Sequence, residues 1–121
     1  MEMVRRVGVH KLYHVFTGRV DSYCVIELDG DSVVCNVYSL TEEIEQTEWL
    51  GGMAIVSPFF FKRKAEETFA SFCKRMKEAM EKNDLSAFPV KAYYVFPFNL
   101  IQMEFDKNSR ITLLSGEILH K

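Results

Sequence analysis

The sequence predicts an α+β fold, in which a mainly antiparallel sheet of about six to seven strands packs on one long amphipathic helix. Two observations lead to this class. A segment with helical periodicity, residues 57–83, lies between two regions that alternate apolar and polar residues as strands do. The dipeptide Asp29-Gly30, which favours a tight hairpin turn, stands between two such runs. The expected order is three strands, a short helix, a strand, the long helix and three strands.

The long helix is predicted from its start signal and its apolar stripe. Ser57 suits the N-cap and Pro58 the first helical position, while Asn83-Asp84 ends the segment. Apolar residues follow at spacings of three and four, as one buried face requires. They are Ala65, Phe69, Phe72, Met76, Ala79 and Met80.

The strands before the helix are predicted from turn residues. Residues 9–16 form a strand that ends at Thr17-Gly18. A type I′ turn at Asp29-Gly30 sets Leu28 opposite Asp31 and Cys24 opposite Cys35. One face of this hairpin is then apolar: Cys24, Ile26, Leu28, Val33, Cys35 and Val37. The two cysteines are close enough in this register for a disulfide, but small apolar residues filling the core is the plainer interpretation.

The short helix and the remaining strands are predicted in the same way. The acidic residues 41–50 form a short helix capped by Ser39, and residues 53–56 form a short strand. Three strands follow the long helix, at residues 90–96, 100–105 and 110–114, with a loop at residues 107–109. That loop sets Phe105 opposite Ile111. One face of the sheet is covered by the helix and the other is at least partly open.

Composition limits the function. The chain has 121 residues, expected as one domain over residues 1–121, with 48% hydrophobic and 26% charged residues. Its formal charge of −2 gives no global basic field for nucleic acid or a membrane. No apolar run suits a membrane helix, and the first residues do not resemble a secretory signal. Three cysteines, an odd number, favour a reducing compartment, so a cytoplasmic location is expected.

The least ordinary segment is Phe59-Phe60-Phe61-Lys62-Arg63-Lys64. In the predicted helix its three cations fall in the first two turns, where the helix dipole favours acidic residues. A helix N-terminus with lysine and arginine suits a phosphate, a carboxylate or an acidic peptide. The alternative is that Glu66 and Glu67 neutralise Lys62 and Arg63 and the stretch is only solvated. At least one phenylalanine of the three must face outward.

Trp49 is the only tryptophan in the chain and stands at the end of the acidic stretch. Tryptophan is enriched at the energetic centres of protein interfaces. In a symmetric dimer the acidic stretch of one subunit would meet Lys62–Lys64 of the other. A solvated acidic face on a monomer explains the same residues equally well.

No catalytic, metal or cofactor motif is predicted. His10 and His14 lie on one face of a strand but about 13 Å apart, too far to share a metal. Turn chemistry explains Asp29 and Asp31 without calcium, and the cysteine spacing is not that of a zinc site.

The sequence supports three hypotheses of function. The first is a non-enzymatic module that binds another protein, as a homodimer or as a subunit of a complex, through Trp49 and Phe59–Lys64. The second is a binder of an anionic ligand or nucleic acid through the basic start of the helix, with nucleic acid disfavoured by the net charge. The third is a small-ligand or enzymatic domain with a pocket between helix and sheet, using His10, His14, Glu27 or tyrosines.

Overall fold

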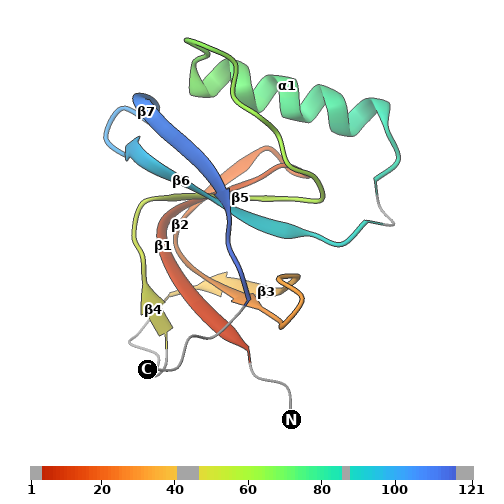
Figure 1. Ribbon diagram of the computed structural model, residues 1–121, viewed down its shortest axis with the longest axis vertical. Helices are drawn as coiled ribbons and strands as arrows, with labels where there is room; N and C mark the ends of the chain where they lie inside the picture. The colour runs from red at the N-terminus through yellow and green to blue at the C-terminus, as the bar shows by residue number, and fades with distance from the viewer. Residues whose placement is uncertain (1–3, 41–46, 86–87, 117–121) are drawn as a thin grey trace.

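The structure is a computed structural model that describes residues 4–40, 47–85 and 88–116. It confirms the α+β class with a mainly antiparallel sheet (Figure 1). The described residues form seven strands and one helix, in the order β1 (Arg5–His14), β2 (Arg19–Leu28), β3 (Val34–Ser39), β4 (Thr47–Trp49), β5 (Met53–Ser57), α1 (Phe69–Lys82), β6 (Lys91–Asn99) and β7 (Glu104–Leu113).

The strands lie in the order β3-β2-β1-β5-β6-β7, and β4 also pairs with β1. Both β4 and β5 run parallel to β1, and the other neighbours are antiparallel. Between β4 and β5 the chain bends at Gly51 and Gly52, which have φ values of +69° and +68°. Here the amides of His10 and Lys11 both donate to the Gly52 carbonyl at 3.1 Å. This shared carbonyl ties the bend to β1 just where the β1–β5 pairing begins, at Lys11 and Met53.

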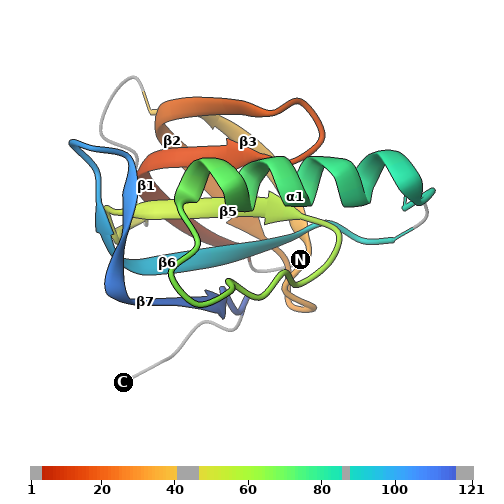
Figure 2. The same ribbon diagram turned by 90° about the horizontal axis from the view of Figure 1, so that it is seen from above.

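Both faces of the sheet carry a core. On one face α1 lies over the sheet (Figures 1 and 2) and covers a buried cluster that includes Ile55, Phe72 and Val95. On the other face the sheet curls over a second cluster that includes Val9, Ile26 and Val56. Part of this face stays open, as expected, because Phe96, on the same side of β6 as Ala92 and Tyr94, is 62% exposed. The curl of the sheet brings β3 against the segment before β6, where the Val34 amide donates to the Val90 carbonyl at 2.8 Å.

The helix is shorter than the sequence predicted. It begins at Phe69, and its N-cap is Thr68, whose hydroxyl accepts from the Ser71 amide at 3.2 Å. Ser57 is instead the last residue of β5, and its hydroxyl bonds both backbone groups of Phe59. The predicted stripe is confirmed for the part within α1, where the side chains of Phe69, Phe72 and Met76 are buried. Ala65 is exposed and lies before the helix.

The β2–β3 hairpin has a longer loop than predicted. Cys24 pairs with Ser39, and Leu28 with Val34, so Cys24 and Cys35 are not cross-strand partners. Gly30 does not take a positive φ, as a type I′ turn needs. The Asp29 carboxylate accepts from the amides of Asp31 and Val33 instead, at 2.9 and 3.0 Å. This side-chain cap closes the wider loop. Cys35 is exposed, contrary to the predicted apolar face.

The C-terminal region forms two long strands, where three short ones were predicted. Phe105 lies opposite Phe98, and Ile111 opposite Val95, so the predicted Phe105–Ile111 pair is wrong. The predicted loop exists as a large bulge at residues 106–109 within β7, closed by the Ser109 hydroxyl, which accepts from the Asp106 amide at 2.8 Å. Ile101, which the sequence placed in the strand over residues 100–105, lies in a turn and is 97% exposed.

The predicted short helix over residues 41–50 lies in part outside the described residues. Its last portion, Thr47–Trp49, is the strand β4. In the strand, these three residues pair with β1. At the end of a short helix, several of their backbone groups would have no partner. The short strand predicted at residues 53–56 is confirmed as β5. No helix within the described ranges is long and apolar enough to cross a membrane.

Gly52→Ala is expected to lower the free energy of unfolding by about 1–3 kcal/mol, because alanine is strained at φ +68° and its Cβ would lie 2.8 Å from the Tyr94 hydroxyl. Urea unfolding followed by circular dichroism measures this change. Gly30→Ala is the control, because a methyl group there meets no atom within 4 Å. Equal stability of the two variants would contradict the assigned bend.

Candidate functional site

Two adjoining depressions lie between the segment before α1 and the strand β7. The larger has a volume of about 520 Å³ and the smaller about 360 Å³. Both are lined by Arg63 and Ser109, so we treat them as one groove. Its other lining residues are Phe60, Lys62, Arg110, Ile111 and Thr112 in the larger part, and Lys64, Ala65, Glu66 and Lys107 in the smaller. We call it the basic groove, after its five cations Lys62, Arg63, Lys64, Lys107 and Arg110.

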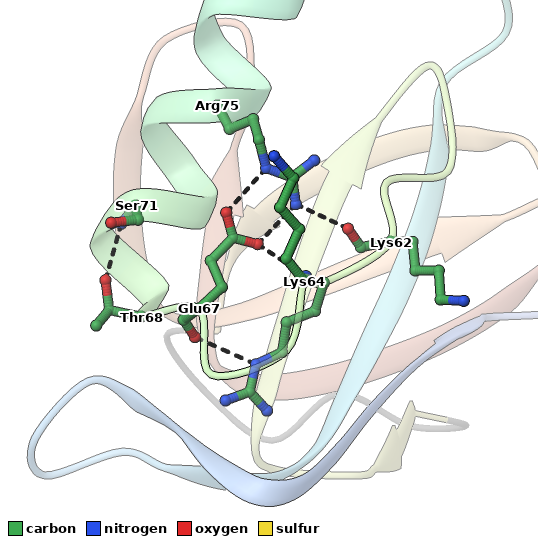
Figure 3. A network of polar contacts seen from close by, with 7 residues as sticks. Lys62, Lys64, Glu67, Thr68, Ser71 and Arg75 are labelled. Atoms are coloured by element: carbon green, nitrogen blue, oxygen red, sulfur yellow. Dashed lines mark hydrogen bonds and ion pairs between the residues drawn. The ribbon is translucent and has the colours of Figure 1, made fainter.

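A carboxylate holds the first wall of the basic groove in place. Glu67 accepts two hydrogen bonds from Arg75 of α1, at 2.6 and 2.8 Å, and one from the Lys64 amide at 3.0 Å (Figure 3). Arg75 also donates to the Lys62 carbonyl at 2.8 Å. These bonds tie the irregular segment to the helix. The hydrogen bonds from Arg75 hold the pKa of Glu67 below its ordinary value.

Arg63 joins the two walls of the groove. Its Nε donates to the Glu67 carbonyl at 3.2 Å, and its Nη1 donates to the Asp106 carbonyl, in the β7 bulge, at 2.8 Å. Its guanidinium lies 4.2 Å from the centre of the Phe105 ring. Backbone carbonyls orient the guanidinium but do not cancel its charge, so Arg63 keeps a full positive charge at the groove.

The groove cations are not neutralised by their surroundings. None of the five forms an ion pair with a carboxylate in the described part of the chain. The alternative in which Glu66 and Glu67 neutralise Lys62 and Arg63 is therefore wrong. Glu67 is engaged by Arg75, and Glu66, exposed at φ +60°, forms no ion pair with a described residue. Lys62, Arg63 and Lys64 also lie before the helix, so the argument from the helix dipole does not apply to them.

The three phenylalanines of the predicted site separate into different environments. Phe61 packs against Phe72 of α1 at 5.8 Å and lies under the Arg75 guanidinium at 4.4 Å. Phe59 contacts Phe61 edge to face at 5.2 Å. Phe60 is 54% exposed and lines the groove, so it is the outward-facing member that the sequence required.

Trp49 belongs to a different surface. It stacks on Tyr23 with 6.1 Å between ring centres and an angle of 12°, and it meets His10 edge to face at 4.9 Å. Its ring also covers Gly8, where a Cβ would lie 2.7 Å from the indole. These contacts are all with β1 and β2 and none is with the groove. The structure therefore does not bring Trp49 together with residues 59–64.

Sequence reasoning missed the second wall of the groove. Lys107, Ser109 and Arg110 lie more than forty residues after Lys64, and only the bulge in β7 brings them beside it. The short loop predicted at residues 107–109 was a signal of polar, exposed side chains there. Nothing in the local pattern paired that loop with residues 62–64.

The two histidines and Glu27, which were considered for a catalytic site, each contact a different partner within the described residues. His10 accepts from the Gly52 amide at 2.9 Å, His14 lies 3.0 Å from Asp21, and Glu27 pairs with Arg6. Burial raises the pKa of the Cys73 thiol to about 12, so it remains protonated at neutral pH. Among the described residues no group of three or more His, Cys, Asp or Glu side chains is placed to hold a metal ion.

Comparison of the chain with protein-family models, curated proteins and solved structures finds no match. The basic groove is therefore the evidence for the function of this protein.

Proposed function

We propose that this protein is a non-enzymatic interaction module that binds an acidic segment of a partner protein in the basic groove. The observation that supports it is the set of five cations without described carboxylate partners, lining one groove from two separate parts of the chain. An unneutralised cluster of this kind attracts carboxylates, and each charge-assisted bond to lysine or arginine is stronger than a neutral one.

The lining favours a peptide over a nucleic acid. Phe60 and Ile111 give the groove an apolar part, which suits the aliphatic side chains of a peptide. A single strand of nucleic acid needs a series of aromatic rings for its bases, and among the described residues Phe60 is the one ring that lines the groove. The net charge of −2 also repels a long polyanion.

The partner in this proposal is a different protein or a second copy of the chain. Trp49 and Tyr23 form a separate exposed aromatic surface, 48% and 54% exposed, which would suit a further contact in a complex. Sedimentation velocity on the purified protein separates the two partners. A concentration-dependent dimer that the groove variant below abolishes would identify the second copy as the occupant.

The triple variant Lys62→Gln/Lys64→Gln/Lys107→Gln is expected to weaken binding of an acidic probe by about ten- to a hundredfold, because three charge contacts are lost. The probe is a fluorescein-labelled peptide of about ten residues in which glutamate and valine alternate. Fluorescence anisotropy at low and high salt measures its affinity. None of the three side chains forms an ion pair with a described residue, so the fold should be retained.

The matched control is Lys74→Gln/Lys77→Gln/Lys82→Gln, which removes the same charge from exposed positions of α1 outside the groove. It is expected to bind the probe as the parent does. Equal weakening by both triple variants would show that only net charge matters, and tight binding of a single-stranded oligonucleotide in place of the peptide would show a different class of ligand. Either result overturns the proposal.

A further inference from the structure

Among the residues that the structure describes, the strand beside the basic groove is an edge of the sheet. β7 is the last strand in the order and pairs on one side with β6 (Figures 1 and 2). The larger depression lies against residues 109–112, so space remains next to this strand. The bulge ends at Ser109, and from Arg110 to Leu113 the register with β6 is regular.

The hydrogen-bond pattern shows which residues of β7 face outward. The Leu114 amide donates to the Ala92 carbonyl at 2.8 Å, which makes these two a hydrogen-bonded pair. In an antiparallel ladder such pairs alternate with pairs that make no mutual bonds. Tyr94 with Thr112 is therefore bonded. Ile111 and Leu113, between these pairs, direct their N–H and C=O groups away from β6.

The positive charge on this edge favours an acidic partner strand. Exposed edge strands invite pairing with other strands, and a cation there discourages pairing with a like-charged strand. Arg110 is exposed on this edge and lines the groove. A second copy paired through the same edge would place Arg110 near its own equivalent. An acidic strand would instead meet Arg110 and the other groove cations with opposite charge.

We propose that the partner segment binds as an added β-strand on β7, with backbone bonds to Ile111 and Leu113 and acidic side chains at the groove cations. This deepens the proposed function and rests on it. Ile111 links the sheet edge to the basic groove. Its backbone N–H and C=O face away from β6, and the same residue lines the groove. The expected ligand is an extended segment with acidic side chains on alternate residues, since alternate side chains of a strand share one face.

The test uses two changes to backbone hydrogen bonding. Leu113→Pro removes an outward N–H and leaves the ladder with β6 intact, and proline is tolerated on an edge strand where its missing N–H faces solvent. Leu113→Ala is the control, because it trims the half-exposed side chain and keeps the N–H. With the glutamate–valine probe, the proline variant should bind about fivefold or more weakly than the alanine variant.

The second measurement leaves the protein unchanged. The probe is methylated on the backbone nitrogens of alternate residues, in two frames. One frame blocks the N–H groups that would face β7 and should lose binding about tenfold, while the other should bind as the parent probe does. This readout does not depend on whether Leu113→Pro folds.

Three outcomes are distinguishable. A loss with the proline variant and with one methylated frame supports strand addition. If both frames bind equally and the groove variant still weakens binding, the partner is held by charge alone, so strand addition is wrong and the proposed function stands. If the unmodified probe does not bind the parent protein, both proposals are overturned.

Discussion

Phe72→Ala is expected to lower the free energy of unfolding by about 3–5 kcal/mol. The Phe72 side chain is fully buried and lies at the centre of the core between α1 and the sheet. Its ring meets Phe61 at 5.8 Å and Phe105 at 5.3 Å, both edge to face. Alanine would remove these contacts and leave a cavity that the surrounding strands and helix cannot fill completely. Urea unfolding followed by circular dichroism measures the change.

Phe96→Ala is the control for this prediction. Phe96 is on β6 but is 62% exposed, so its loss should cost less than about 1 kcal/mol. If both variants unfold at the same urea concentration, α1 does not seal the sheet through Phe72. The assignment of the helix to this face would then be wrong.

Glu67→Gln is expected to lower the free energy of unfolding by about 2–3 kcal/mol at pH 7. The Glu67 side chain is 8% exposed and that of Arg75 is 26% exposed, so the pair is largely shielded from water. Glutamine keeps the shape but loses the charge, which leaves the Arg75 guanidinium without its counter-ion. Glutamine also leaves one fewer acceptor oxygen for the bonds from Arg75 and the Lys64 amide, which weakens the attachment of the segment carrying Lys62–Lys64 to α1. Urea unfolding of the two proteins measures this difference.

The stability difference between the parent protein and Glu67→Gln is expected to depend on pH. Because Arg75 lowers the pKa of Glu67 in the folded protein, the stabilisation is fully present above the ordinary glutamate pKa of about 4.3 and is lost as the pH falls through the folded value. The stability difference between parent and Glu67→Gln should therefore shrink on acidification from pH 7. Arg5 also lowers the pKa of Glu48, and this effect cancels because both proteins retain that pair. A difference that stays constant with pH would contradict the role assigned to Glu67.

Local patterns predicted the parts of the fold that depend on neighbouring residues. The spacing of Phe69, Phe72 and Met76 identified the buried face of α1, and Thr17-Gly18 marked the β1–β2 turn, where the Gly18 amide donates to the His14 carbonyl at 2.8 Å. Each signal involves residues within one or two turns of each other. Periodicity and turn chemistry are therefore sufficient for them.

Contacts between distant residues account for the errors. Residues 57–68 have both a helix start signal and apolar residues, yet the structure ends β5 at Ser57 and begins the helix only at Phe69. Here Glu67 bonds Arg75 and the Lys64 amide, and Arg63 bonds the β7 bulge. In β2–β3, the Asp29 side chain competes with the tight turn and shifts the register. None of these bonds has a periodic signature.

The sequence alone determined the fold class, the apolar face of the helix and the presence of an unusual cationic run at Lys62–Lys64. The tertiary structure decided that this run precedes the helix, that Glu67 does not neutralise it, and that Lys107 and Arg110 complete the groove. The reason is physical. Secondary structure and burial follow from short-range spacing, whereas a binding groove depends on which distant segments the sheet places side by side.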